Sequence, residues 1–139
     1  LNKNIIEFGI KLCASIAKEC LDSSMPVGFV CNGIDEITNT PMEIIMPSQD
    51  INQIVKICDI LARIKLQVDQ YIETLLYDIL RSYNFNELFL ITCFINKETE
   101  DLIRTYSQYG LKITLIMIDH DEKASNLESE NVRIFWAKE

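Results

Sequence analysis

The sequence predicts an α/β domain with a mostly parallel sheet that helices cover on both faces. One observation is an almost unbroken apolar run at residues 88–95, because strands without polar alternation are typical of parallel sheets buried on both sides. Another is the unit that follows: a helical pattern from Asn96 to Gly110, and then a second apolar run at residues 113–118. A strand, a helix and a parallel strand in this order form a crossover, which is almost always right-handed.

The chain before this unit is predicted to begin with one long helix and one strand. Residues 3–23 place apolar and small side chains at spacings of three and four, as an amphipathic helix does. Residues 27–31 form an apolar run that stops at Asn32-Gly33, a pair of residues typical of turns. We therefore expect this helix to pack against a sheet to which the apolar run contributes a strand.

An edge strand and two helices are predicted next. After a polar loop at residues 34–41, two prolines flank a short strand at residues 43–46, and prolines this close to a strand suit a sheet edge. Ser48 or Asp50 can cap the first helix, and Asp69 can cap the second. The side chains expected to be buried are Ile51, Ile54, Val55, Cys58, Leu61 and Ala62 in the first helix, and Ile72, Leu75, Leu76, Ile79, Leu80 and Tyr83 in the second.

The end of the chain completes the predicted sheet. The crossover helix is expected to bury Leu102, Ile103 and Tyr106. Residues 119–130 are polar, which predicts a loop with one turn of helix. Residues 132–136 alternate enough to form a last strand at a sheet edge.

Composition limits the classes of protein that the chain can belong to. At 139 residues, with 48% apolar and 24% charged residues, residues 1–139 are predicted to form a single domain. The net charge of -8 argues against non-specific binding to nucleic acid or anionic membranes. Five widely spaced cysteines without a CxxC pair indicate reduced thiols in a cytoplasmic compartment, and no segment is apolar for the length of a membrane helix.

The carboxyl ends of the predicted strands are where a parallel sheet binds ligands. The densest polar group there is Asp119, His120, Asp121 and Glu122, which are residue types that can hold a divalent metal or act as an acid and base. The alternative interpretation is a solvated loop after a strand, which we prefer because neighbours in a chain rarely converge on one ion. The sequence contains no GxGxxG, P-loop, GxSxG or HExxH motif, so no cofactor or nucleotide is predicted.

One family shares the order of these elements. The helix with Phe8-Gly9-Ile10-Lys11-Leu12-Cys13-Ala14-Ser15-Ile16-Ala17, followed by Pro26-Val27-Gly28-Phe29-Val30-Cys31-Asn32-Gly33, resembles the bacterial and archaeal family called domain of unknown function fifty-eight. Its members carry a von Willebrand factor A-like domain. The resemblance extends over nearly the whole chain, including Leu90-Ile91-Thr92 and the helix that ends at Tyr109-Gly110-Leu111.

This resemblance implies a doubly wound, Rossmann-like sheet that is truncated at its N-terminus. The strand missing before Leu1 would lie between the strand at 27–31 and the strand at 88–95. We expect these two strands to pair directly, or the chain to form a homo-oligomer or a strand-exchanged dimer. Related domains hold a metal with an Asp-x-Ser-x-Ser loop after the first strand, a Thr in a second loop and an Asp in a third. The first loop would precede Leu1, and the Asp position would fall just after Ile91-Thr92, where this chain has Cys93-Phe94-Ile95-Asn96 and no Asp. Thr92 alone is too little, so no metal site is carried over.

The resemblance also implies a function. Family members are commonly encoded beside MoxR-type AAA+ ATPases, with which they are thought to act in the assembly or maturation of protein complexes, and many are anchored to the cytoplasmic membrane by a preceding segment. We therefore expect a non-enzymatic protein-interaction module with such an ATPase as its partner.

The alternative is an enzyme, a metal-dependent hydrolase or transferase that uses the cluster at residues 119–122. A thermal-shift scan with Mg²⁺ and Mn²⁺ on the wild type and on Asp119→Ala and Asp121→Ala distinguishes these two functions, because a ligand that binds only the folded state raises the melting temperature. A receiver-like phosphoacceptor domain would need acidic residues at several strand ends, and only one end is acidic.

Overall fold

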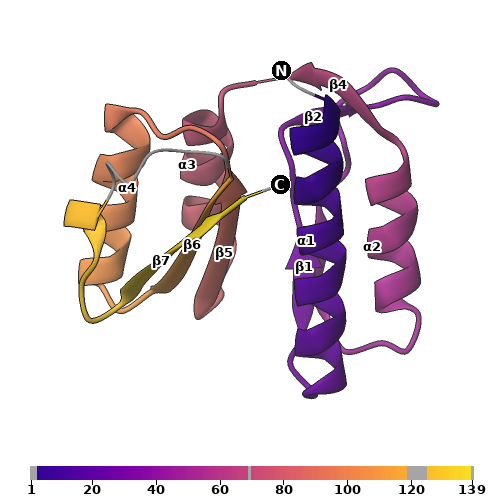
Figure 1. Ribbon diagram of the computed structural model, residues 1–139. Helices are drawn as coiled ribbons and strands as arrows, with labels where there is room; N and C mark the ends of the chain where they lie inside the picture. Colours follow the sequence, from indigo (N-terminus) through magenta and orange to yellow (C-terminus); the bar gives the residue numbers. More distant parts are fainter. Residues whose placement is uncertain (1–2, 69, 119–124, 139) are drawn as a thin grey trace. The chain divides into compact units, whose positions relative to one another are not determined.

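The computed structural model describes residues 3–68, 70–118 and 125–138 (Figure 1). These residues form helices and short strands, and the chain divides into two compact units, one up to Tyr71 and the other from Ile72 on. The α/β class is therefore confirmed. The strands pair into three small sheets, of which only the three-stranded one is parallel, so the described pairings do not form the single doubly wound sheet that we expected.

The first unit contains two helices and four short strands. Its elements are α1 (Lys3–Asp22), β1 (Val27–Phe29), β2 (Gly33–Asp35), β3 (Ile45–Ser48), α2 (Gln53–Ala62) and β4 (Ile64–Val68). β1 pairs with β3, and β2 pairs with β4, both in antiparallel direction. The sequence predicted neither β2 nor β4. β2 is only three residues long, too short to show a periodic pattern, and it consists of residues that were predicted to belong to the turn pair and the polar loop.

The core of the first unit lies between its two helices and the β1–β3 pair. Val27, Phe29 and Ile45 pack against a buried cluster of Ala17 from α1 and Ile57 and Leu61 from α2. β1 approaches β3 so closely that a Cβ atom on Gly28 would lie 2.5 Å from the carbonyl oxygen of Ile45. Only glycine fits at this position without moving the backbone.

The buried stripe of α2 differs from the predicted one. The structure buries Gln53, Ile57, Ile60 and Leu61, whereas of the predicted stripe only Leu61 is fully buried and Ile54 half-buried. Ile51, Val55, Cys58 and Ala62 are exposed. The prediction was wrong because α2 carries apolar side chains around most of its circumference, so periodicity alone fits two stripes. In the structure, the buried stripe is the one that includes a polar residue, Gln53, whose side chain is hydrogen-bonded.

The predicted helix caps in this region were also wrong or lie outside the described residues. Ser48 Oγ accepts a hydrogen bond from the backbone N–H of Asp50, and Asp50 Oδ1 accepts one from the N–H of Asn52, at 2.9 and 2.8 Å. These two side chains therefore shape the turn before α2, and Asn52 takes the N-cap position. Asp69, the predicted cap of the next helix, lies outside the described residues.

The second unit is built around a parallel sheet. Its elements are α3 (Ile72–Ser82), β5 (Glu87–Thr92), α4 (Lys97–Gln108), β6 (Lys112–Ile118), the 3-10 turn η1 (Ser125–Leu127) and β7 (Val132–Ala137). The strands lie in the order β5-β6-β7, which confirms the predicted crossover and the edge position of the last strand. The pairing expected between the strands at 27–31 and 88–95 is not among the described pairings, in which β1 pairs with β3 and β5 with β6.

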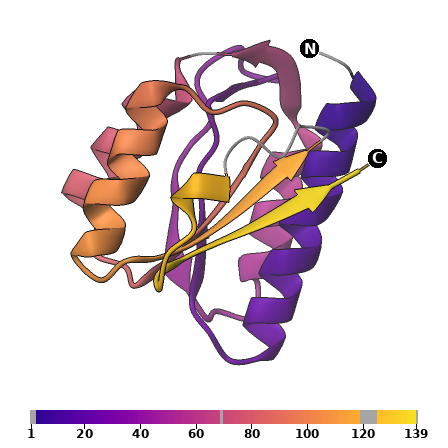
Figure 2. The same cartoon turned by 60° about the vertical axis from the view of Figure 1, so that its left-hand side comes forward.

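Within this unit, α3 and α4 pack on each other and lie on the same face of the sheet (Figures 1 and 2). The row Leu90, Leu115 and Ile134 runs across that face, and all three side chains are buried. The opposite face carries Phe89 and Phe135, which are exposed, and Ile116 and Ile118, which are buried. The expectation of helices on both faces is therefore not met within this unit.

The ends of α4 follow the sequence prediction. Asn96 is the N-cap, and its side chain accepts a hydrogen bond from the N–H of Thr99 at 2.9 Å. Gly110 follows the helix with a φ of +99°, a conformation that favours glycine. Ile103 is buried and Leu102 and Tyr106 are half-buried, and α3 buries Leu75, Leu76 and Ile79 of its predicted stripe. No helix of the described residues is both long enough and apolar enough to cross a membrane.

Candidate interaction surface on α2

The polar cluster singled out by the sequence, Asp119, His120, Asp121 and Glu122, lies outside the described residues. In the ranges that the structure does describe, no three His, Cys, Asp or Glu side chains are placed so that they could hold a metal ion. The metal-site alternative therefore stays a sequence-based hypothesis.

The polar side chains at the other predicted strand ends are hydrogen-bonded to backbone groups of the protein. At the end of β5, Thr92 Oγ1 donates to the carbonyl oxygen of Phe94 at 2.9 Å and accepts from the N–H of Phe94 at 3.3 Å. After β1, Asn32 Nδ2 donates to the carbonyl oxygen of Gln70 at 3.0 Å. These contacts hold two turns in place, which is a structural role.

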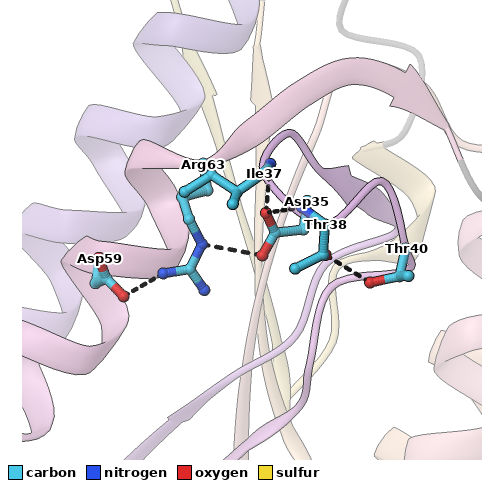
Figure 3. A network of polar contacts seen from close by, with 6 residues as sticks. All are labelled: Asp35, Ile37, Thr38, Thr40, Asp59 and Arg63. Carbon is cyan, nitrogen blue, oxygen red and sulfur yellow. Dashed lines mark hydrogen bonds and ion pairs between the residues drawn. The ribbon is translucent and has the colours of Figure 1, made fainter.

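The most connected polar network of the first unit joins β2 to the end of α2 (Figure 3). Asp35, at the end of β2, is buried, and its Oδ1 accepts hydrogen bonds from the N–H groups of Ile37 and Thr38 at 2.8 and 3.3 Å. Its Oδ2 accepts from Nε of Arg63 at 2.9 Å. Arg63 follows the last turn of α2, and its Nη1 also donates to Asp59 on that helix.

This network fixes the charge of Asp35. Burial by itself raises the pKa of a carboxyl group, but the N–H groups of Ile37 and Thr38 and the guanidinium of Arg63 stabilise the carboxylate more strongly. The pKa of Asp35 therefore lies below its ordinary value of 3.8. The bonds to Asp35 and Asp59 raise the pKa of Arg63 above its ordinary value, so the pair is fully charged at neutral pH. Both oxygens of Asp35 are occupied, which makes it a structural clamp rather than an acid or base for a substrate.

Gln53 forms a second clamp at the other end of α2. Its side chain is 2% exposed, and its Nε2 donates to the carbonyl oxygens of Val27 and Met46 at 2.7 and 2.9 Å. Gln53 thereby ties the first turn of α2 to β1 and β3 at once. This dual bond explains why a polar residue occupies the buried stripe, since a buried amide is tolerated when it is hydrogen-bonded.

The two clamps fix which side of α2 faces solvent. That side presents Val55, Cys58 and Asp59, beside the half-buried Ile54 and beside Ile51 in the turn before α2, and we refer to these five residues as the α2 surface. Ile54, Val55, Cys58 and Asp59 line a shallow depression on it. Ile51 is 90% exposed and Val55 is 64% exposed. A contiguous set of exposed apolar side chains with one acidic residue beside it is typical of a site that binds another protein.

Sequence reasoning missed Asp35, Gln53 and Arg63. Asp35 followed by Thr38 and Thr40 carries a weak signal, because an Asp that accepts from backbone N–H groups two and three residues later is common in turns. Nothing in the sequence indicates that Asp35 pairs with Arg63, which lies 28 residues further on.

We compared the chain with known proteins. No family model, curated protein or solved structure matches this chain.

Proposed function

We propose that this chain is a non-enzymatic protein-interaction module of the von Willebrand factor A type that acts with a MoxR-type AAA+ ATPase in the assembly or maturation of protein complexes. The family resemblance of the sequence supports this proposal. Two features of the fold agree with it: the strand–helix–strand crossover of β5, α4 and β6, and the antiparallel strand β3 with Pro47 in it.

The α2 surface is the observation on which the proposal mainly depends. Ile51, in the turn before α2, lines one depression with Ile54, and Val55 lines the other depression with Ile54, so both exposed residues lie beside Ile54. Burying one aliphatic side chain of this size is worth about 1.5–3 kcal/mol. Two or three such side chains are enough to anchor a complex, because a few central residues supply most of the binding free energy.

The charged groups near the α2 surface are mostly paired with one another. Asp59 is paired with Arg63, and the second depression beside Ile51 and Ile54 is lined by Asp50 and by the ion pair of Lys18 and Asp22. The apolar side chains, rather than an unpaired acidic rim, therefore define the partner's contact face, which must be apolar at its centre. The net charge of the chain is -8, which favours a basic partner because charge complementarity speeds encounter.

The test is a binding titration with a MoxR-type ATPase whose gene neighbours that of this protein. We expect Val55→Asp to weaken binding at least about tenfold, which corresponds to 1.4 kcal/mol, because it places an unpaired charge in an apolar contact. Tyr109→Asp is the matched control, since Tyr109 is 85% exposed on the second unit and the substitution adds the same charge. Equal affinities for the wild type and Val55→Asp, or no binding of the wild type, would reject the proposal.

A further inference from the structure

β5 is an edge strand with the sequence of a central strand. Among the described residues it pairs with β6 alone, so its other edge has no strand partner there. Its residues Leu88, Phe89, Leu90 and Ile91 are apolar on both faces, as is typical of strands in the middle of parallel sheets. Edge strands normally carry charged side chains, a proline or a bulge that prevents pairing with other chains, and of these Glu87–Thr92 contains only the charge of Glu87 at its first residue.

The backbone groups on the free edge of β5 follow from the register. The N–H of Lys112 donates to the carbonyl oxygen of Asn86, so the backbone groups of Asn86 face β6. The groups of successive residues in a strand alternate between its two sides, so Leu88, Leu90 and Thr92 also face β6. The N–H and C=O groups of Glu87, Phe89 and Ile91 therefore face the free edge.

We propose that two copies of this chain pair through their β5 edges, antiparallel and about a two-fold axis at Phe89. In this register Phe89 lies opposite Phe89 of the second copy, Glu87 opposite Ile91, and Leu88 opposite Leu90. Each outward residue then exchanges both backbone hydrogen bonds with an outward residue of the other copy. The two three-stranded sheets become one continuous sheet.

The side chains favour a second copy of this chain as the occupant of this edge. The register brings apolar residues together, including an aromatic pair on the axis, and places no like charges opposite each other. A shift by one residue would join the helix-covered face of one sheet to the opposite face of the other, so the pleat excludes it. An isologous contact of this kind closes after two copies, which predicts a dimer rather than a fibre.

Solution mass measured over a range of protein concentrations tests the proposal. The wild type is expected to reach twice the mass of one chain, and Phe89→Lys to raise the dissociation constant at least tenfold, because a charged side chain on the axis faces its own copy. The matched control is Phe135→Lys, since Phe135 lies on the same face of the sheet as Phe89 and is 53% exposed, but belongs to β7 at the opposite edge. A monomeric wild type, or an equal effect of both substitutions, would overturn the proposal.

Amide hydrogen exchange on the wild type provides a readout that needs no variant. The amides of Phe89 and Ile91 are expected to become protected as the protein concentration rises. The amide of Leu90 faces β6 and should be protected at all concentrations. Protection of Phe89 and Ile91 that does not change while the mass doubles would place the dimer contact elsewhere. Neither experiment involves the α2 surface, so its failure leaves the proposed function unaffected.

Discussion

Gln53 provides the sharpest test of how the first unit is held together. The substitution Gln53→Met keeps the length and approximate volume of the side chain, and the two residues have similar helix propensities. It removes the Nε2 donor that bonds the carbonyl oxygens of Val27 and Met46 at 2.7 and 2.9 Å. The hydrophobic core is otherwise unchanged, so the measured difference reports the clamp.

The magnitude follows from the two bonds. Each hydrogen bond of this kind contributes about 0.5–1.5 kcal/mol net, and an acceptor left unpaired in a buried place costs about 1–3 kcal/mol. Part of this free-energy cost is offset, because the variant no longer buries the polar amide of Gln53. We therefore expect the free energy of unfolding to fall by about 2 kcal/mol, a factor of nearly thirty in the unfolding equilibrium constant.

The assay is urea unfolding followed by far-ultraviolet circular dichroism. Gln108→Met is the matched control, because Gln108 is exposed at the end of α4 and the same change there should stay within about 0.5 kcal/mol of the wild type. A loss below about 0.5 kcal/mol for Gln53→Met would refute the reasoning, since it would mean that the two carbonyl groups find equivalent partners without the amide.

Three further predictions concern single side chains. The low pKa of Asp35 means that its carboxylate stabilises the fold above pH 3.8 and that this contribution is lost as the pH falls through the lower pKa of the folded state. The difference in unfolding free energy between the wild type and Asp35→Asn should therefore shrink in acid. A difference that does not depend on pH would contradict this. Gly110→Ala should destabilise the second unit by about 1 kcal/mol in thermal unfolding, because the φ of +99° is strained for alanine. An added Cβ has nothing within 4 Å of it, so the effect reports the backbone strain alone, and an unchanged melting temperature would count against that strain. Iodoacetamide should modify the exposed Cys58 first and Cys13 last, because burial, with a smaller effect of Cys31, raises the pKa of Cys13 to about 12. Equal rates of modification, measured by peptide mass spectrometry, would show that Cys13 is accessible.

The sequence predicts the second unit well because its signals are local. The apolar runs, the cap at Asn96 and the glycine at 110 each determine a structure within a few residues, so β5, α4 and β6 appear close to where they were expected. β7 was placed correctly at an edge because it alternates.

The first unit is less predictable because its structure depends on contacts between distant residues. The orientation of α2 is decided by Gln53, which bonds carbonyl groups 26 and 7 residues earlier in the chain. The pairing of Asp35 with Arg63 and the pairing of β2 with β4 are equally non-local. For the same reason, Val55 and its exposed neighbours were expected in the core, and the α2 surface was invisible in the sequence.

The measurement that tests the proposed function most directly is hydrogen exchange by mass spectrometry on this chain with and without the MoxR-type ATPase. If the α2 surface binds the ATPase, backbone amides in the peptide over residues 51–59 should exchange at least several times more slowly in the complex. Peptides over β7 should be unaffected. Slower exchange confined to other segments, with residues 51–59 unchanged, would contradict the assignment of the binding site to α2.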